Sequence, residues 1–239
     1  MTTPAGVKGR VKAADHVALL RKVPLLAKIS ERELRLLASV SRIQEVPKEA
    51  LVFEEGDVGN ALYAVVSGMV KIYRTSSGGR VKALAFLEHG DFFGEMAIID
   101  REIRSASARA LELSRILVLR RQDFERILER NPRIAFRVMQ TLCARLRNAD
   151  VQIDMLSFQG VLGRVANTLL ELAQKHGVRT ARGTRIDSEF THEDLAEMVG
   201  SAREMVTKIL NRFKRANAIA LEGRHITITD EAQLRAWIL

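Results

Sequence analysis

Two charged side chains near the middle of the chain have the types and the spacing to hold a sugar phosphate. Glu95 directly follows Gly94, and Arg104 comes nine residues after Glu95, immediately before Ser105. Arginine offers a planar, permanently charged fork to phosphate oxygens and serine adds a hydroxyl donor, whereas glutamate only accepts and suits a sugar hydroxyl. By spacing alone, a structural Glu95–Arg104 ion pair at a strand turn is the simpler alternative.

The residues around Glu95 have the properties of an anion-binding turn. Gly94 permits a close backbone approach or a positive φ. Met96 and Ala97 fall in the segment 95–99, which can form one helical turn whose free amides face an anion. The segment is therefore a candidate site for a ligand that carries a phosphate.

A second candidate site lies in residues 191–214, which have the pattern of two helices joined by a tight turn. Thr191 is a good N-cap with Asp194 three residues later, and Gly200 stands where such a turn needs a glycine. The second helix has one apolar stripe, formed by Val206, Ile209, Leu210 and Phe213. A helix-turn-helix is therefore predicted.

The opposite face of the second helix carries the chemistry for reading base edges. Arg203 and Lys208 can donate to guanine, and Glu204 can accept from cytosine. Thr207 and Asn211 share this face. Because a carboxylate beside DNA lowers the affinity unless it meets a donor, Glu204 favours base recognition over a merely solvated surface.

A hairpin is predicted to follow these two helices. Two short apolar runs, Ile219–Leu221 and Ile226–Ile228, flank a turn that contains Gly223. Such a wing would bring Arg224 to a DNA phosphate, and Thr191 is also counted among the expected DNA contacts.

The segment from residue 43 to residue 119 must position Glu95 and Arg104, and its apolar pattern has a period of two. Short apolar runs are separated by turn residues at a spacing of roughly 8–12 residues, which is typical of a small antiparallel barrel or roll. Ahead of them, Ser30 and Glu33 have the spacing of a capping box, which predicts a helix through residue 37. The predicted strands are Ala50–Phe53, Leu62–Val66, Val70–Tyr73, Val81–Leu87 and Ile116–Leu119.

A long helix is predicted over residues 137–160, because apolar residues recur there at alternating steps of three and four. Both flanks of this seam are polar, which favours a parallel pairing of two chains over packing of the helix on its own roll. Cys143, in the same helix, is expected to be packed and inert. The predicted dimer contacts are Met139, Leu142, Leu146, Ala149, Ile153 and Leu156.

Composition sets broad limits on the function. The 239 residues suffice for two domains, and the net charge of +9 suggests a polyanionic partner. The charge is uneven, since residues 1–160 hold 26 Lys and Arg against 19 Asp and Glu, whereas residues 161–239 hold 12 against 10. No apolar run reaches 18 residues and no signal sequence is recognised, so a cytoplasmic protein without a membrane partner is predicted. Five scattered histidines and one cysteine offer no metal or catalytic constellation, so an enzyme is not expected.

From about residue 20 to its end, the chain resembles the cyclic-AMP receptor protein/Fnr family of bacterial transcription regulators. The resemblance implies an α+β fold with an N-terminal antiparallel β-roll of the cyclic-nucleotide-binding type, a long dimerisation helix and a C-terminal winged helix-turn-helix. The expected boundaries are 1–20 for an N-terminal arm, 21–136 for the roll, 137–160 for the helix and 161–239 for the DNA-binding domain. The motifs that carry the resemblance are Gly94-Glu95-Met96-Ala97, Arg104-Ser105-Ala106 and Arg203-Glu204-Met205-Val206-Thr207-Lys208.

The resemblance also assigns ligand contacts. Glu95 is expected to hold the ribose 2′-hydroxyl, and Arg104 and Ser105 the cyclic phosphate. Cyclic-AMP-dependent members typically read adenine with a threonine and a serine or asparagine on the long helix. Alanine cannot hydrogen-bond there, whereas an aspartate still accepts from an amino group, so a weaker or differently arranged adenine selectivity is predicted. The expected contacts on that helix are Arg145, Ala149 and Asp150.

In the second site, the family's recognition helix commonly reads Arg-Glu-Thr-Val-x-Arg and is associated with TGTGA-like half-sites. Lys208 stands here for the last arginine and loses its bidentate geometry, and Ala202 stands where a serine or threonine often caps the helix. A related but relaxed half-site is therefore predicted.

Together these features predict a homodimeric regulator that binds a palindromic, TGTGA-like site in double-stranded promoter DNA. A cyclic nucleotide is the predicted effector, with cyclic AMP the first choice and no obligatory cofactor or metal, and contact with RNA polymerase is expected from the family. The alternative is a ligand-independent regulator of the same fold, whose activity follows its concentration. The iron–sulfur and haem branches of the family need cysteine or histidine ligands near the N-terminus. His16 is the one such residue before His89, so neither branch is expected.

Overall fold

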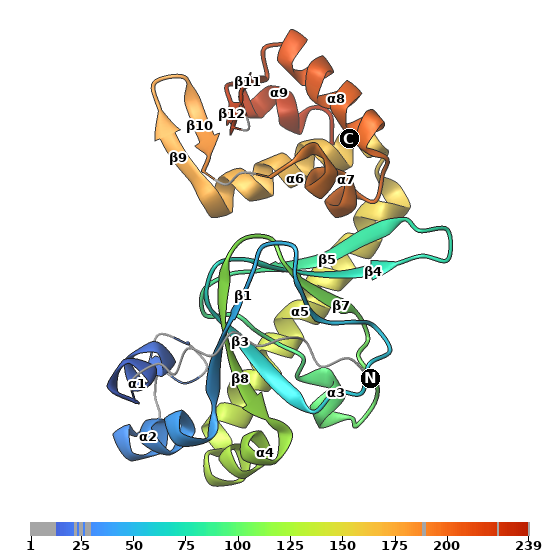
Figure 1. Ribbon diagram of the computed structural model, residues 1–239. Coiled ribbons are helices and arrows are strands. Elements are labelled where there is room, and N and C mark those ends of the chain that lie inside the picture. The colour runs from blue at the N-terminus through green and yellow to red at the C-terminus, as the bar shows by residue number, and fades with distance from the viewer. Residues whose placement is uncertain are drawn as a thin grey trace. The chain divides into compact units, whose positions relative to one another are not determined.

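The computed structural model describes residues 13–21, 23, 26, 30–187, 190–223 and 225–238 (Figure 1). The chain divides into two compact units. The first comprises the described residues up to Arg74 together with Leu84–Ala144, and the second comprises Thr75–Ala83 and the described residues from Arg145 onward. Within the described residues, no helix combines the length and the hydropathy that crossing a bilayer requires.

Two four-stranded antiparallel sheets make up the β-roll, with strand orders β1-β8-β3-β6 and β2-β7-β4-β5 (Figure 1). A hydrophobic core that includes Val65, Val70 and Ile116 draws residues from both sheets and lies between them. The strands are β1 (Arg42–Val46), β2 (Leu51–Phe53), β3 (Ala61–Ser67), β4 (Val70–Thr75), β5 (Val81–Leu87), β6 (Phe92–Phe93), β7 (Ser107–Ala110) and β8 (Ser114–Arg120). The antiparallel roll predicted from the period-two pattern is thus confirmed, and five of its strands overlap the predicted apolar runs.

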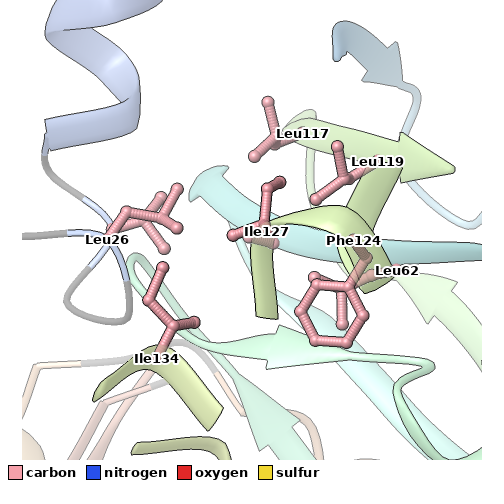
Figure 2. Close-up of a pocket in the computed structure, with 9 residues that line it drawn as sticks. Leu26, Leu62, Leu117, Leu119, Phe124, Ile127 and Ile134 are labelled. Atoms are coloured by element: carbon pink, nitrogen blue, oxygen red, sulfur yellow. The ribbon is translucent and has the colours of Figure 1, made fainter. Parts of the chain in front are cut away.

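Helices cover the other face of the β1-β8-β3-β6 sheet. A second core brings together Leu62 of β3, Leu117 of β8 and Phe124 of α4. Residues of this core line a small apolar pocket, and Figure 2 shows Leu26, Ile127 and Ile134 among the side chains that close it. The pocket has no polar lining residue, so it is a packing space rather than a phosphate site. The helices are α1 (Ala13–Arg21), α2 (Glu31–Val40), α4 (Arg121–Arg130) and the first part of α5 (Pro132–Phe158).

Local sequence explains where α2 and α5 begin. Ser30 caps α2 and accepts a hydrogen bond from the amide of Glu33, whose carboxylate accepts one from the Ser30 amide at 2.9 Å, so the predicted capping box is present. Pro132 is the first residue of α5. That placement suits proline because the amide it lacks would have no partner in a first turn.

The second unit contains the helix-turn-helix and a four-stranded antiparallel sheet of order β11-β12-β10-β9 (Figure 1). The first strand of its β9–β10 hairpin shows no apolar alternation in the sequence, and its residues are all exposed. The elements are α6 (Val161–His176), β9 (Gly177–Thr180), β10 (Gly183–Ile186), α7 (His192–Val199), α8 (Arg203–Arg215), β11 (Ile219–Glu222), β12 (His225–Ile228) and α9 (Glu231–Arg235).

Candidate functional site

Glu95 and Arg104, the pair singled out by spacing, are both buried in the first unit, with 2% and 3% of their surface exposed. The pairing of Tyr63 with Phe93 fixes the end of β6, and Gly94 follows it directly. The guanidinium of Arg104 donates through Nη1 to the carbonyl of Gly94 at 2.6 Å and through Nη2 to the carbonyl of Ala61 at 2.7 Å. The cation is therefore held inside the roll by backbone dipoles.

Two glycines make room for the Arg104 side chain. Gly94 has φ of +77°, and a Cβ on it would lie 2.6 Å from Nη1 of Arg104. A Cβ on Gly59 would lie 2.4 Å from Cβ of Ala97 and 3.1 Å from Cζ of Arg104. Both approaches are closer than van der Waals contact allows, so larger residues would displace the guanidinium. Gly94 was identified from its place beside Glu95, whereas Gly59 was missed because it lies in a different turn.

The turn before β3 also holds the backbone of Arg104. Its amide donates to the carbonyl of Asp57 at 2.8 Å, and its carbonyl accepts from the amide of Gly56 at 2.9 Å. A single β-bridge pairs Val58 with Ile103. This pairing fixes the segment that carries Arg104, and it joins stretches of chain about fifty residues apart, which local sequence patterns do not reveal.

Aromatic rings surround the buried cation. The guanidinium carbon of Arg104 lies 4.3 Å from the ring centroid of Phe53 and 5.5 Å from that of Tyr63. Phe93 stacks on Tyr63 with a centroid distance of 5.2 Å. Burial lowers the pKa of Arg104 from its ordinary value, and Tyr63, Asp57 and Glu95 act in the opposite direction. Arginine remains charged under all such shifts, so the roll contains a permanent positive charge in largely apolar surroundings.

Arg121, at the start of α4, ties the two segments of the site together. Its Nη2 atom donates to the carbonyl of Gly59 at 2.5 Å and to the carbonyl of Ala97 at 2.9 Å. It therefore fixes the distance between the turn that borders Arg104 and the short helix α3 (Met96–Ile99). This role of Arg121 was not predicted, because an arginine at a strand–helix junction has no distinctive sequence pattern.

The remaining predicted ligand residues fall into two groups. Ser105 is exposed, and its Oγ lies 3.8 Å from Sδ of Met96, which is also exposed. These two residues lie in the same unit as Gly94, Glu95, Ala97 and Arg104. A different group, on the part of α5 that belongs to the second unit, consists of Arg145, Ala149 and Asp150.

The helix-turn-helix has the predicted boundaries and caps. Thr191 caps α7 in a capping box with Asp194, whose carboxylate accepts from the Thr191 hydroxyl at 2.6 Å. Gly200 ends α7 in the left-handed region with φ of +67°. Ala202 precedes α8 and makes no capping bond with its side chain, as expected from its residue type. The buried stripe of α8 consists of Val206, Ile209, Leu210 and Phe213.

The predicted base-reading side chains lie on the open face of α8. Arg203, Glu204, Lys208 and Asn211 are exposed, whereas Thr207 is half-buried. The hydroxyl of Thr207 lies 2.9 Å from Nδ1 of His192, the first residue of α7. The wing is present as β11 and β12, paired from Ile219 with Ile228 to Glu222 with His225. Arg224 lies outside the described residues.

An apolar stripe runs along α5. Leu146 is 65% exposed and Ile153 60%, and Met139, Ala149 and Leu156 are exposed as well. Leu142, the remaining residue of the predicted seam, is partly buried and packs against the core between the helices and the sheet of the first unit. The stripe also includes Phe136, which was not predicted and is 59% exposed. Cys143 was predicted to be packed, which is wrong: the open side of α5 leaves it exposed.

The two units match two known families. Residues 43–131 match the cyclic nucleotide-binding domain, and residues 163–237 match the Crp-like helix-turn-helix domain. The chain is 35% identical to the cyclic AMP receptor protein of Thermus thermophilus, over 88% of this chain and 94% of that protein. It is 34% identical to the CRP-like cAMP-activated global transcriptional regulator of Mycobacterium tuberculosis, over 83% of this chain and 90% of the relative.

A solved structure shares the fold. The c-di-GMP-responsive global regulator of Xanthomonas campestris superposes with a TM-score of 0.73, covering 81% of this chain and 95% of that one, at 24% sequence identity. At this identity the similarity supports the architecture of both units but not a ligand.

Proposed function

The chain belongs to the cyclic-AMP receptor protein/Fnr family of bacterial transcription regulators, and on that premise we propose that it is a homodimer whose affinity for a palindromic promoter site is controlled by a cyclic nucleotide. The coarser part of this statement, a DNA-binding regulator with a cyclic nucleotide-binding domain, follows from family membership, and family members are regulators rather than enzymes. The identity of the effector, the homodimer and the palindromic promoter site are what we propose.

The buried charge of Arg104 is the observation that carries the effector proposal. A guanidinium that is already surrounded by Gly94, Ala61 and aromatic rings is a preformed partner for a singly charged cyclic phosphate. The neighbouring carboxylate of Glu95 supplies the acceptor for a ribose hydroxyl. Ser105, and the chain from Gly94 through Ala97, complete the proposed phosphate contacts.

Cyclic AMP is the first candidate effector, because two relatives above 30% identity are named for it. The proposed contacts to the base are Arg145, Ala149 and Asp150 of α5. Only the aspartate of the last two can accept a hydrogen bond, so cyclic AMP and cyclic GMP are expected to differ less in affinity than in a site with two polar readers.

The DNA proposal rests on the exposed face of α8. Arg203 and Lys208 supply donors for guanine edges, and Glu204 supplies an acceptor for the cytosine amino group. Asn211 and Thr207 complete the proposed reading face, and Thr191 and Arg224 are proposed phosphate contacts. A TGTGA-like half-site is the expected target.

The dimer proposal rests on the exposed apolar stripe of α5. A heptad seam that stays open on one chain is covered most simply by the same seam of a second chain. In a two-fold dimer, the two α8 helices would read half-sites about 34–36 Å apart, which explains why a palindrome is expected. RNA polymerase is the further expected partner at the promoter.

One observation favours ligand-independent regulation as the second candidate. Both terminal nitrogens of Arg104 already donate to backbone carbonyls and the guanidinium lies over the ring of Phe53, so the protein itself holds this side chain in place. In that case the roll is a scaffold, and promoter occupancy depends only on the protein concentration.

A DNA-binding titration at one fixed salt concentration separates the two candidates, since salt alone changes such affinities strongly. The protein is titrated onto a duplex selected from random DNA, first alone and then with cyclic AMP, cyclic GMP or cyclic di-GMP. A nucleotide that changes the affinity by about 5- to 150-fold, a usual coupling between sites, supports gating. An affinity that no nucleotide changes would leave the scaffold interpretation.

A further inference from the structure

A side-chain hydrogen bond joins the two helices of the helix-turn-helix. Nδ1 of His192, in the first turn of α7, lies 2.9 Å from Oγ1 of Thr207, in the second turn of α8. Both side chains are half-buried, so the bond is partly shielded from water. It connects α7, whose cap Thr191 is a proposed phosphate contact, with α8, the helix proposed to read bases.

Thr207 stands at the border between the buried stripe and the reading face. Its predecessor Val206 is fully buried and its successor Lys208 is exposed. Threonine is β-branched and, in a helix, populates two χ1 rotamers, which differ in the directions of the hydroxyl and the methyl group. A partner for the hydroxyl selects one rotamer and so decides which group the reading face presents.

The bond also limits what the hydroxyl can offer to a base. A threonine hydroxyl has one donor proton and two acceptor lone pairs. If Nδ1 carries a proton, the hydroxyl accepts from it and remains free to donate. If Nδ1 is unprotonated, the hydroxyl donates to it and can only accept. In either tautomer, His192 assigns Thr207 a defined role at a base edge.

We propose that His192 is a specificity-determining residue that acts through Thr207, by fixing the rotamer and the hydrogen-bonding role of the threonine that faces the groove. The proposal rests on the proposed DNA-reading role of α8. His192 is a positioning residue in this scheme, because it needs no contact with a base. The simpler alternative is that His192 binds a DNA phosphate and Thr207 is a bystander.

A double-mutant cycle on DNA tests the coupling. The duplex is first selected by the wild-type protein, and the variants are His192→Leu, Thr207→Val and both together, measured on that duplex and on its single-base-pair substitutions. Each single change is expected to weaken binding roughly 3- to 10-fold, the size of one net hydrogen bond. The double variant should bind like either single one, and all three should lose preference at the same base pair.

Rescue by the conservative variant gives a second test. Asparagine places an amide atom the same number of bonds from the backbone as Nδ1, whereas glutamine extends one bond farther. His192→Asn is expected to retain the base preference and His192→Gln to lose it. These two polar variants also serve if His192→Leu fails to fold, which thermal unfolding would show. Thr180→Val, in the β9–β10 hairpin, is the control for a lost hydroxyl and should bind like the wild type.

Three results would overturn the proposal. Losses that multiply in the double variant would show that the two residues act independently. A reduced salt slope for His192→Leu, with equal weakening on every duplex, would make His192 a phosphate contact. A wild-type protein that selects no duplex would overturn the proposed function itself, which is distinguishable because the other two results require wild-type binding.

Discussion

Nη1 of Arg104 and the carbonyl oxygen of Gly94 are 2.6 Å apart, so the cation proposed for the phosphate is bonded to the turn that carries Glu95. This bond couples the two halves of the proposed anion site through the protein's own atoms. It also makes one side chain responsible for both the local stability and the proposed affinity. Substitutions at Arg104 and at Gly94 should therefore change both properties, and the two effects are separable by measurement.

Arg104→Gln is expected to remove nucleotide binding, lowering the affinity by at least roughly 10-fold because a charge-assisted phosphate contact is lost. It should also destabilise the roll by about 1–3 kcal/mol for each buried carbonyl left unsatisfied. Calorimetry with cyclic AMP measures the first effect and urea unfolding the second. Arg35→Gln, at an exposed arginine of α2, is the matched control. Unchanged nucleotide binding in Arg104→Gln would contradict the proposed phosphate contact.

Gly94→Ala is expected to destabilise the protein by about 1–3 kcal/mol and to weaken nucleotide binding. Alanine is strained at the positive φ of this position, and its methyl group would also clash with the Arg104 guanidinium. Gly56→Ala provides the control, since Gly56 has φ of +89° with no atom within 4 Å of an added Cβ. Urea unfolding of both variants separates backbone strain from the clash. If both variants lost equal stability, the clash with Arg104 would be refuted.

Acid is expected to destabilise the first unit through His16. Burial lowers the pKa of this histidine below its ordinary value of about 6.5, and Nε2 lies 3.1 Å from Oγ of Ser41. A lowered folded-state pKa favours the neutral ring, so this contribution to stability is complete above about pH 6.5 and is lost as the pH falls through the folded pKa. His16→Phe should flatten the dependence of unfolding free energy on pH in that window.

The capping carboxylate of Glu33 provides a contrast to His16. Hydrogen bonds with Ser30 lower the pKa of Glu33, so its contribution is present above the ordinary carboxyl pKa and is lost at more acidic pH. Glu33→Gln should therefore leave the histidine window unchanged. An unaltered slope between pH 7 and pH 5 in His16→Phe would show that His16 does not govern it.

Ile153→Asp is expected to convert the dimer to single chains, because a charge would replace an exposed apolar side chain at a heptad position of the proposed seam. Promoter affinity should fall with it, since each chain would then contact one half-site. Light scattering after gel filtration measures the assembly state. Val151→Asp is the control, since Val151 is also exposed on α5 but lies off the heptad positions. Single chains in the wild-type protein under DNA-binding conditions would refute the dimer.

Glu204→Ala is expected to reduce discrimination at one base pair of each half-site by about 1–3 kcal/mol, because the acceptor for a cytosine amino group would be lost. Competition between the selected duplex and its single-base-pair substitutions measures the change. Glu231→Ala, in α9, is the control for the loss of one acidic charge. Equal tightening on all duplexes would mean that Glu204 only repels DNA.

Local sequence predicted those parts of the fold that local physics determines. The capping boxes at Ser30 and Thr191, the buried stripe of α8 and the left-handed Gly200 follow from residue type and spacing, and all are present. The strand β7 was missed because its core side chains are Ala108 and Ala110, which are too small to give an apolar signal.

The candidate site was predictable only in part, because its surroundings come from distant segments. Gly94, Glu95 and Arg104 could be identified from eleven residues of sequence. Phe53 and Gly59, which bound the guanidinium, come from turns and strands about fifty residues earlier and become neighbours only when the sheets pair. The hydrogen bond between His192 and Thr207 likewise depends on how two helices pack.

The buried position of Arg104 has a consequence for which anions the site can select. Water has already been removed from the guanidinium during folding, so an arriving ligand loses mainly its own hydration shell. The free-energy cost of dehydration rises steeply with charge density. A compact dianion such as inorganic phosphate therefore loses more on binding than a diffuse monoanion does. In the proposed site, inorganic phosphate would therefore be disfavoured by the cost of its dehydration rather than by its shape.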